Sequence, residues 1–468
     1  MDRRWLAFIV LCLGDLMIVL DSTVVNVALP TIRSALGFSE ASLAWVVNSY
    51  LLTFGGFLLL GGRLADLYGQ RRLFLIGLSV FVAASLACGL AGSAVVLVAA
   101  RAVQGLGGAV VSAVALSLIT NLFPEPAERV RAMGYFGFVM AAGGSVGVLL
   151  GGLLTDAFDW HWIFLINVPI GAAVFAAAAR LLAADDSART GGKLDFAGAI
   201  TVTTALLLAI YAIVGGNEVG WTSFQTLSML GAGAALLLAF IVIESRVAAP
   251  LMPLHLFRSR NVSVSNVVGV LWAAGMFAWF FLSALYMQSV LGYSPLHVGL
   301  AFLPANIIMG AFSYKLSAIV VNRFGIRTPL VAGLVIAAFG LALFAMVPVG
   351  GAFMLHVLPG MTLLGIGAGV AFNPILLAAM NDVAPEQSGL ASGVVNTSFM
   401  MGGALGLAVL ASLAAARSQF LTAAGAETTV ALHGGYQVAF ALGAALTLAA
   451  GLLSLTLHDS RPAASAPH

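Results

Sequence analysis

Three ionisable side chains lie inside long apolar runs of the sequence, where a charge is costly. Asp15 and Asp21 fall within the run 5–30, and Arg101 falls within the run 95–121. A charged group near the middle of a bilayer is unstable unless it meets water, a partner of opposite charge or a proton. Such residues indicate a pathway for protons, ions or substrates.

The two aspartates have the chemistry of a proton carrier. Burial disfavours the charged form of a carboxylate, so it can take up a proton and release it again when a cation or water approaches. On one helix, Asp15, Ser22 and Asn26 share a face, while Asp21 lies about 120° away. We therefore expect different neighbours for the two acids. A fixed polar contact between helices is the alternative for each of them.

Arg101 precedes Gln104 and Gly108 on the same face of its predicted helix. A buried guanidinium has several N–H donors to satisfy, so we expect an aspartate, backbone carbonyls or substrate acceptors around it. The alternative to a part in proton transfer is a static counter-ion that holds two helices together.

Composition defines the class of protein that holds these residues. Of 468 residues 61% are hydrophobic and 8% are charged, and the mean hydropathy is +1.07. This balance predicts an all-α polytopic membrane protein in contact with the lipid bilayer. The net charge of +2 is scattered over short loops, which argues against nucleic acid as a partner. Cys12 and Cys88 lie inside apolar runs, so we expect neither disulfides nor a metal site.

Fourteen apolar runs are long enough to span a bilayer. They cover residues 5–29, 43–62, 73–92, 95–121, 131–154, 162–182, 195–214, 225–244, 262–291, 297–321, 328–347, 353–380, 389–416 and 434–457. With this count, all but three of the 20 basic residues fall on or near the amino-terminal side, the exceptions being Arg33, Arg101 and Arg417. Basic residues favour the cytoplasmic side, so both termini are expected to be cytoplasmic.

A repeated loop divides the chain. Asp66 and Asn322, Gly69 and Gly325, and Arg71 and Arg327 are separated by the same interval. Both copies follow the second span of a six-span block, as in carriers built from two parallel repeats. We therefore expect a six-helix bundle at 1–182, two inserted helices with their linkers at 183–260, a second six-helix bundle at 261–457 and a cytoplasmic tail at 458–468.

Several stretches carry a family resemblance. The loop 62–72 reads G-x-L-x-D-x-x-G-x-R-R, with Gly62, Asp66, Gly69, Arg71 and Arg72 at its fixed positions. It resembles the signature loop of the major facilitator superfamily. The stretches 20–30, 101–108 and 143–153 with 160–171 resemble helix motifs of its fourteen-span drug:proton antiporters, the multidrug exporters.

The resemblance implies two six-helix bundles that rock between two openings, exchanging inward-moving protons for lipophilic, often cationic, drugs. It implies proton coupling at Asp21, Asp15 and Arg101 and a conformational latch in the loop 62–72, for which ordinary loop capping is the alternative. Gly143, Gly147 and Gly151 would pack helices closely or act as a hinge. The family motif usually has a proline beside these glycines, and this chain has none there.

Further polar and aromatic residues are candidates for a substrate cavity. They are Asn26, Trp45, Asn48, Gln104, Trp279, Tyr286, Asn306, Asn373 and Asn396. Aromatic faces and a few amides suit lipophilic cations. Packing, or a position at the membrane interface, is the alternative for each aromatic residue.

The sequence therefore predicts a proton-driven exporter of small molecules in a bacterial cell membrane, acting as a monomer, with protons as coupling ion and no cofactor or metal. Two alternatives keep the same fold: a carrier that takes up nutrients, and an ion-coupled lipid carrier. A membrane-embedded enzyme is a distant alternative, because the seven histidines are dispersed and no metal or phosphate motif is present.

Overall fold

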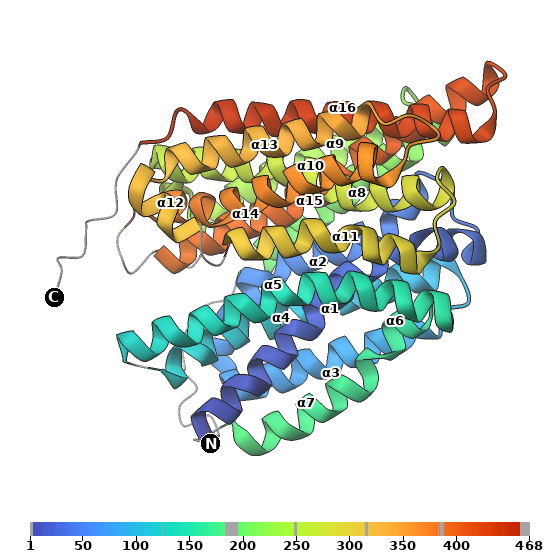
Figure 1. Ribbon diagram of the computed structural model, residues 1–468. Helices are drawn as coiled ribbons and strands as arrows, with labels where there is room; N and C mark the ends of the chain where they lie inside the picture. The colour runs from blue at the N-terminus through green and yellow to red at the C-terminus, as the bar shows by residue number, and fades with distance from the viewer. Residues whose placement is uncertain are drawn as a thin grey trace. The chain divides into compact units, whose positions relative to one another are not determined.

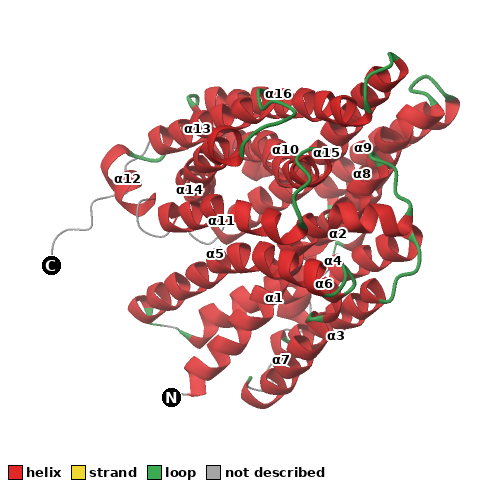
Figure 2. Cartoon of the chain, turned by 45° about the vertical axis from the view of Figure 1, so that its right-hand side comes forward, coloured by secondary structure: helices red, strands yellow, loops and turns green. Residues whose placement is uncertain are grey.

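The computed structural model describes residues 3–123, 125–182, 195–247, 250–313, 317–381, 383 and 388–458. Every regular element within these ranges is a helix (Figures 1 and 2). An isolated segment in lipid must pair all of its backbone N–H and C=O groups internally, and a helix does so. The all-α class expected from composition is thereby confirmed for the described part.

The chain divides into two compact units, the first of which comprises Met1–Met252 and Ser294–Leu300. Its helices are α1 (Arg3–Leu36), α2 (Trp45–Tyr68), α3 (Gln70–Gly89), α4 (Ala94–Leu122), α5 (Pro126–Ala157), α6 (Trp162–Leu165), α7 (Asn167–Leu181), α8 (Phe196–Val219) and α9 (Phe224–Arg246). Within this unit α1 packs against α5, α4 packs against both α2 and α3, and α8 packs against α9. Helices α1, α3, α4 and α7 therefore surround one interior, where the ionisable side chains lie.

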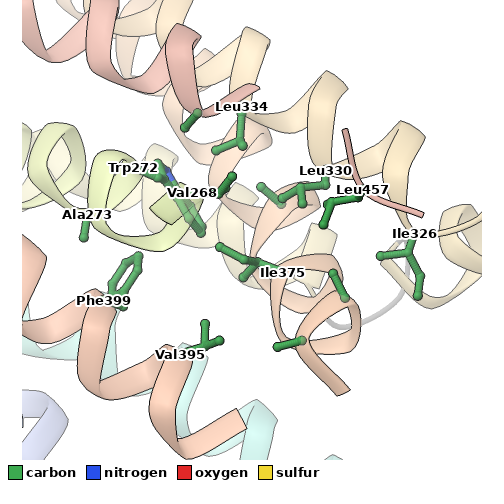
Figure 3. Packing of buried hydrophobic residues seen from close by; sticks show 14 of the residues in the cluster. Val268, Trp272, Ala273, Ile326, Leu330, Leu334, Ile375, Val395, Phe399 and Leu457 are labelled. Carbon is green, nitrogen blue, oxygen red and sulfur yellow. The ribbon is translucent and has the colours of Figure 1, made fainter. Parts of the chain in front are cut away.

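The second unit comprises Pro253–Tyr293 and Ala301–His468. Its helices are α10 (Arg260–Ser289), α11 (Pro295–Ala311, of which the part up to Leu300 belongs to the first unit), α12 (Ser317–Phe324), α13 (Arg327–Ala345), α14 (Leu358–Asn381), α15 (Ser388–Ala423) and α16 (Thr428–Ser454). Helix α10 packs against α15 and α16, and α13 packs against α14 and α16. Trp272 and Phe399 meet edge to face in the apolar core of this unit, with Leu330 and Ile375 in the same cluster (Figure 3).

Twelve helical segments of the described chain are long and apolar enough to cross a membrane. The fifth and tenth runs of the sequence account for two shorter apolar segments, Val146–Ala157 within α5 and Pro295–Ala311. The sixth run is divided at Ile166 between α6 and α7, and residues 314–316, within the tenth run, lie outside the described chain. The count of fourteen spans remains a prediction.

The repeated loop has a positive-φ glycine after the preceding helix in both copies. Gly69 ends α2 with φ of 97° and Gly325 ends α12 with φ of 78°. The Gly69 N–H donates to the Ala65 carbonyl, and the Gly325 N–H donates to the Val321 carbonyl four residues earlier. Side chains rarely adopt positive φ, so glycine is needed at both turns. The two turns thus share a local feature, and the predicted two-repeat organisation with its domain boundaries stays a prediction.

Candidate functional site

Asp21 lies at the centre of a polar cluster in the interior of the first unit. Its side chain forms an ion pair with Arg101 of α4. Both residues are 1% exposed, so neither charge is solvated by bulk water. The expectation that Arg101 meets an aspartate is confirmed, and a buried pair of this kind is stable only if the remaining polar atoms also find partners.

Three side chains donate hydrogen bonds to the Asp21 carboxylate. Arg101 Nη1 donates to Oδ2, Gln104 Nε2 donates to Oδ1 at 2.7 Å, and Asn167 Nδ2, at the first residue of α7, donates to Oδ1 at 2.9 Å. Gln104 and Asn167 are also buried. Each of the three neighbours offers hydrogen atoms, so the arrangement fits the ionised carboxylate.

Arg101 is held by more than Asp21. Its Nε donates to the Val46 carbonyl of α2 at 3.0 Å, and its Nη1 also donates to Gln104 Oε1 at 2.7 Å. The guanidinium carbon lies 4.3 Å from the centre of the Tyr50 ring and 5.6 Å from that of Phe164. A cation over aromatic faces gains electrostatic stabilisation where water is absent. The guanidinium is therefore fixed in position by contacts with α1, α2, α4 and α6.

Gln104 connects the ion pair to α3. Its Nε2 also donates to Ser85 Oγ at 2.7 Å, and the Cys88 thiol donates to its Oε1 at 3.7 Å. Arg101 requires an acceptor and Asp21 requires a donor from the same amide, so the amide has only one orientation that serves both. A proton on Oδ1 of Asp21 would face the Gln104 amide nitrogen, which has no acceptor to offer.

Asp15 belongs to a separate contact. The Asp15 Oδ1 atom accepts a hydrogen bond from the Ser112 hydroxyl of α4, and Asp15 is 6% exposed. Asp15 and Asp21 thus have different neighbours, as expected from their angular separation on one helix. Ser22 and Asn26 share the Asp15 face, but both donate to backbone carbonyls of their own helix, Val19 and Ser22 respectively.

Other cavity candidates of the first unit lie apart from Asp21. Trp45 stands at the start of α2, where its ring centre is 6.4 Å from that of Tyr211 on α8. The two residues line a pocket of about 280 Å³ together with Glu218. Asn48 is fully buried, and neither side-chain atom has a hydrogen-bond partner among the described residues.

The candidates in the second unit form smaller contacts. Trp279 is buried against Phe280 and Phe302, with ring centres 4.4 and 5.7 Å away. The Tyr286 hydroxyl donates to the Pro348 carbonyl at 3.1 Å. Asn373 Nδ2 donates to the Ser313 carbonyl at 3.1 Å, whereas Asn306 Nδ2 is buried without a partner in the described chain. Asn396 is half-buried on α15.

The predicted latch loop contacts two other helices of the first unit: Gln70 donates to Ser117 and accepts from Asn121 of α4, and Arg71 contacts α7. Arg71 Nη2 donates to the Ala179 carbonyl near the end of α7 at 2.5 Å. Gly62 lies on α2 beside Ala113 of α4. The Asp66 side chain lies outside the described part, so the expected contact between it and Arg71 or Arg72 stays a prediction. The observed Arg71 contact joins α3 to the end of α7, where carbonyl groups favour a cation.

Gly143, Gly147 and Gly151 face α1. A Cβ atom at Gly143 would lie 3.3 Å from the Val19 side chain, one at Gly147 would lie 3.1 Å from the Leu20 carbonyl, and one at Gly151 would lie 2.6 Å from the Val24 carbonyl. The three glycines therefore let α5 approach the backbone of the helix that carries Asp15 and Asp21. This geometry is that of close packing.

Sequence reasoning missed three polar residues of these contacts: Asn167 donates to Asp21, Ser112 donates to Asp15, and Ser85 accepts from Gln104. Each is an uncharged polar residue in an apolar run, and such residues are ambiguous because a Ser or Asn side chain can also bond to its own helix. The asparagine in the run WIFLINVPIG was the strongest available signal, since an amide inside a membrane helix needs a partner.

The fold and this site define a class of protein. It is a polytopic membrane protein in which a buried ion pair, with hydrogen-bond partners for both charges, lies inside one helical unit, as in membrane carriers. A family model described as Major Facilitator Superfamily matches residues 11–407. The chain belongs to the major facilitator superfamily. It is therefore a multi-pass plasma membrane transporter and not an enzyme.

Among similar proteins is the puromycin resistance protein pur8 of Streptomyces alboniger, 37% identical over 469 residues, covering 99% of this chain and 93% of the relative. Another is the cephamycin export protein CmcT of Amycolatopsis lactamdurans, 40% identical over 407 residues, covering 86% of this chain and 84% of the relative. The relatives thus include proteins of antibiotic export and resistance.

Solved structures share the fold at low sequence identity. The nucleoside transporter NupG has a TM-score of 0.66 at 12% identity, covering 97% of this chain and 99% of that chain. The partially occluded inward-open form of the xylose transporter XylE from E. coli has a TM-score of 0.64 at 14% identity, covering 99% of both chains. These similarities concern the fold alone.

Proposed function

We propose that the protein is a proton-driven antiporter that exports small lipophilic, cationic drugs or natural-product antibiotics by alternating access. Relatives named for puromycin resistance, cephamycin export and lincomycin resistance support an antibiotic-like cargo. In this proposal the chain crosses the membrane fourteen times, works as a monomer and has both termini in the cytoplasm. Protons are its coupling ion.

One observation carries the proposal: the three side chains that form hydrogen bonds with the Asp21 carboxylate all act as donors. Protonation would place an O–H group against Arg101 at Oδ2 or against Gln104 and Asn167 at Oδ1, and none of the three presents an acceptor in the observed arrangement. Proton uptake must therefore break at least one of these contacts. Since the donors come from α4 and α7, loss of a contact changes how at least one of these helices is held to α1.

Such a dependence is what coupling requires. A ligand shifts an equilibrium between two conformations only by the difference in its affinity for them. A proton that binds only after the donors have separated favours the conformation in which they are apart. A cationic substrate near Asp21 would favour the ionised form, so that proton and substrate compete. This competition gives exchange of one for the other.

The test is efflux of a fluorescent lipophilic cation from proteoliposomes under an imposed proton gradient. Asp21→Asn removes the titrating group and preserves most of the side-chain volume. We expect gradient-driven efflux to fall at least tenfold while the protein still folds and inserts. Asp159→Asn is the matched control, because Asp159 is an exposed acid paired with His161, and its efflux should match that of the unaltered chain. Full efflux in Asp21→Asn would remove Asp21 from the mechanism.

A further inference from the structure

A second pair of acids is buried in the first unit, away from Asp21. Asp195 precedes α8, and Glu244 lies in the last turn of α9; each is 3% exposed. One oxygen of each has a backbone partner. Asp195 Oδ1 accepts from the Gly198 N–H at 2.7 Å, and Glu244 Oε2 accepts from the Met252 N–H at 2.9 Å.

The other oxygen of each acid points toward the other acid. Asp195 Oδ2 and Glu244 Oε1 are buried and have no hydrogen-bond partner among the described residues. A Cβ atom at Gly198 would lie 2.5 Å from Asp195 Oδ2 and 2.6 Å from Glu244 Oε1, so both oxygens flank the same point. The two side chains are within reach of a hydrogen bond to each other. That bond needs a donor, and two ionised carboxylates offer none.

Among the described residues, no ion pair supplies a counter-charge to the two acids. An apolar cluster of Leu60, Ala199 and Leu251 lies beside the pair. Arg246 of α9 and Arg63 of α2 are exposed, and the described chain records no ion pair between either of them and the two acids. The other titratable side chains of α8 are Tyr211 and Glu218, and both line the pocket that Trp45 also lines.

Lys193, two residues before Asp195 in the sequence, and the Asp66 side chain of α2 lie outside what the structure describes.

We propose that Asp195 and Glu244 bind one proton between them, forming a proton site separate from Asp21. Two ionised carboxylates this close and buried from bulk water repel each other strongly. A shared proton turns that repulsion into a hydrogen bond. The bound species is a carboxylic acid paired with a carboxylate. Occupancy keeps Glu244 in place, and Glu244 holds the backbone of Met252.

The shared proton affects how the chain after α9 is held, which proton binding at Asp21 does not. Met252 is the last residue of the first unit before the chain enters the second unit. Loss of the proton would leave two negative charges facing each other. Separation of α8 from α9, or release of Met252 by Glu244, would reduce the repulsion between them. The site therefore ties the attachment of the linker after α9 to local pH.

Infrared spectroscopy of the purified full-length protein detects the shared proton directly. In an Asp15→Asn, Asp21→Asn background, we expect a C=O band of a protonated carboxyl at neutral pH. Glu244→Gln or Asp195→Asn should abolish it, since an amide hydrogen then serves as the donor and no proton is needed. Asparagine also remains a good residue at the start of a helix. Glu218→Gln, which changes an exposed acid of α8, should leave the band unchanged.

Stability against pH gives a second readout. The folded chain holds one proton that the unfolded chain releases near neutral pH, so the free energy of unfolding decreases as pH rises. The thermal midpoint should fall more between about pH 6 and about pH 9 for the unaltered chain than for Glu244→Gln. A neutral-pH spectrum without the carboxyl band, a band that survives both substitutions, or identical pH profiles would overturn the proposal. Each outcome is independent of drug efflux.

Discussion

The carboxylate of Asp21 is paired with the guanidinium of Arg101 in the interior of the first unit, although the two residues are 80 positions apart. The pair joins α1 to α4 at a point where both side chains are almost fully buried. Buried pairs are costly to assemble and more costly to leave half-formed. Comparing the loss of one charge with the loss of both therefore distinguishes an effect on stability from an effect on transport.

Removing the guanidinium alone should destabilise the protein more than removing both charges. Arg101→Met leaves Asp21 ionised and without its counter-charge, which costs about 3–5 kcal/mol in comparable buried pairs. Adding Asp21→Asn should recover much of that loss, yet restore no gradient-driven efflux. The measurement is the thermal midpoint in detergent for the two single variants and the double variant.

Arg417→Met, which replaces an exposed arginine of α15, is the control for that cycle and should change the midpoint little. Equal midpoints for Arg101→Met and the double variant would show that the two charges are not coupled in the folded protein.

Asp15→Asn should affect transport less than Asp21→Asn. The Asp15 carboxylate accepts the Ser112 hydroxyl hydrogen, and an asparagine side-chain oxygen can accept the same hydrogen bond. We expect efflux within about tenfold of the unaltered chain, whereas Asp21→Asn loses more. The measurement is the initial rate of cation efflux in proteoliposomes under the same proton gradient. A larger loss for Asp15→Asn would make Asp15 the main proton carrier.

Gly151→Leu should separate α5 from α1, and Gly144→Leu should not. A Cβ at Gly151 would meet the Val24 carbonyl at 2.6 Å and the Val24 Cα at 3.0 Å, while a Cβ at Gly144 meets nothing within 4 Å. Overpacking costs about 1–3 kcal/mol in well-packed interiors. We expect a lower thermal midpoint and slower efflux for Gly151→Leu only. Equal behaviour of the two variants would contradict the packing at this interface.

Gly69→Ala and Gly325→Ala should each destabilise the turn that follows the preceding helix, α2 or α12. Both positions have positive φ, and a Cβ there costs about 1–2 kcal/mol per residue. Gly37→Ala, at a third positive-φ turn outside the repeat, controls for the backbone cost. We expect similar losses of stability in all three variants but slower efflux only for the two repeat positions. Unchanged efflux in Gly69→Ala would argue against a latch in this loop.

The helices could be predicted well because apolar runs in this chain are long and are separated by polar loops. The runs 73–92 and 328–347 correspond closely to α3 and α13. Breaks inside an apolar run were not visible, as in the run 162–182, which the structure divides at Ile166. Nothing in composition distinguishes a broken helix from a continuous one when both halves are equally apolar.

The site could be predicted in part. Asp21 and Arg101 were conspicuous because each places a charge in an apolar run, and the structure brings them together. Asn167 was not found, since a neutral amide near the start of a helix has several ordinary explanations. The acid pair Asp195 and Glu244 was missed for another reason. The two residues are 49 positions apart in the sequence, and only the packing of α8 on α9 brings their carboxylates near each other.

The thiol of Cys88 offers a built-in probe of the interior. It contacts Gln104 Oε1 and is fully buried, and Cys12 is the only other cysteine in the chain. After Cys12→Ala, alkylation of the remaining sulfur by a membrane-impermeant reagent would occur only when the space around Gln104 opens to one aqueous side. Applying the reagent first outside and then inside the vesicle would time each opening separately, without any labelled drug.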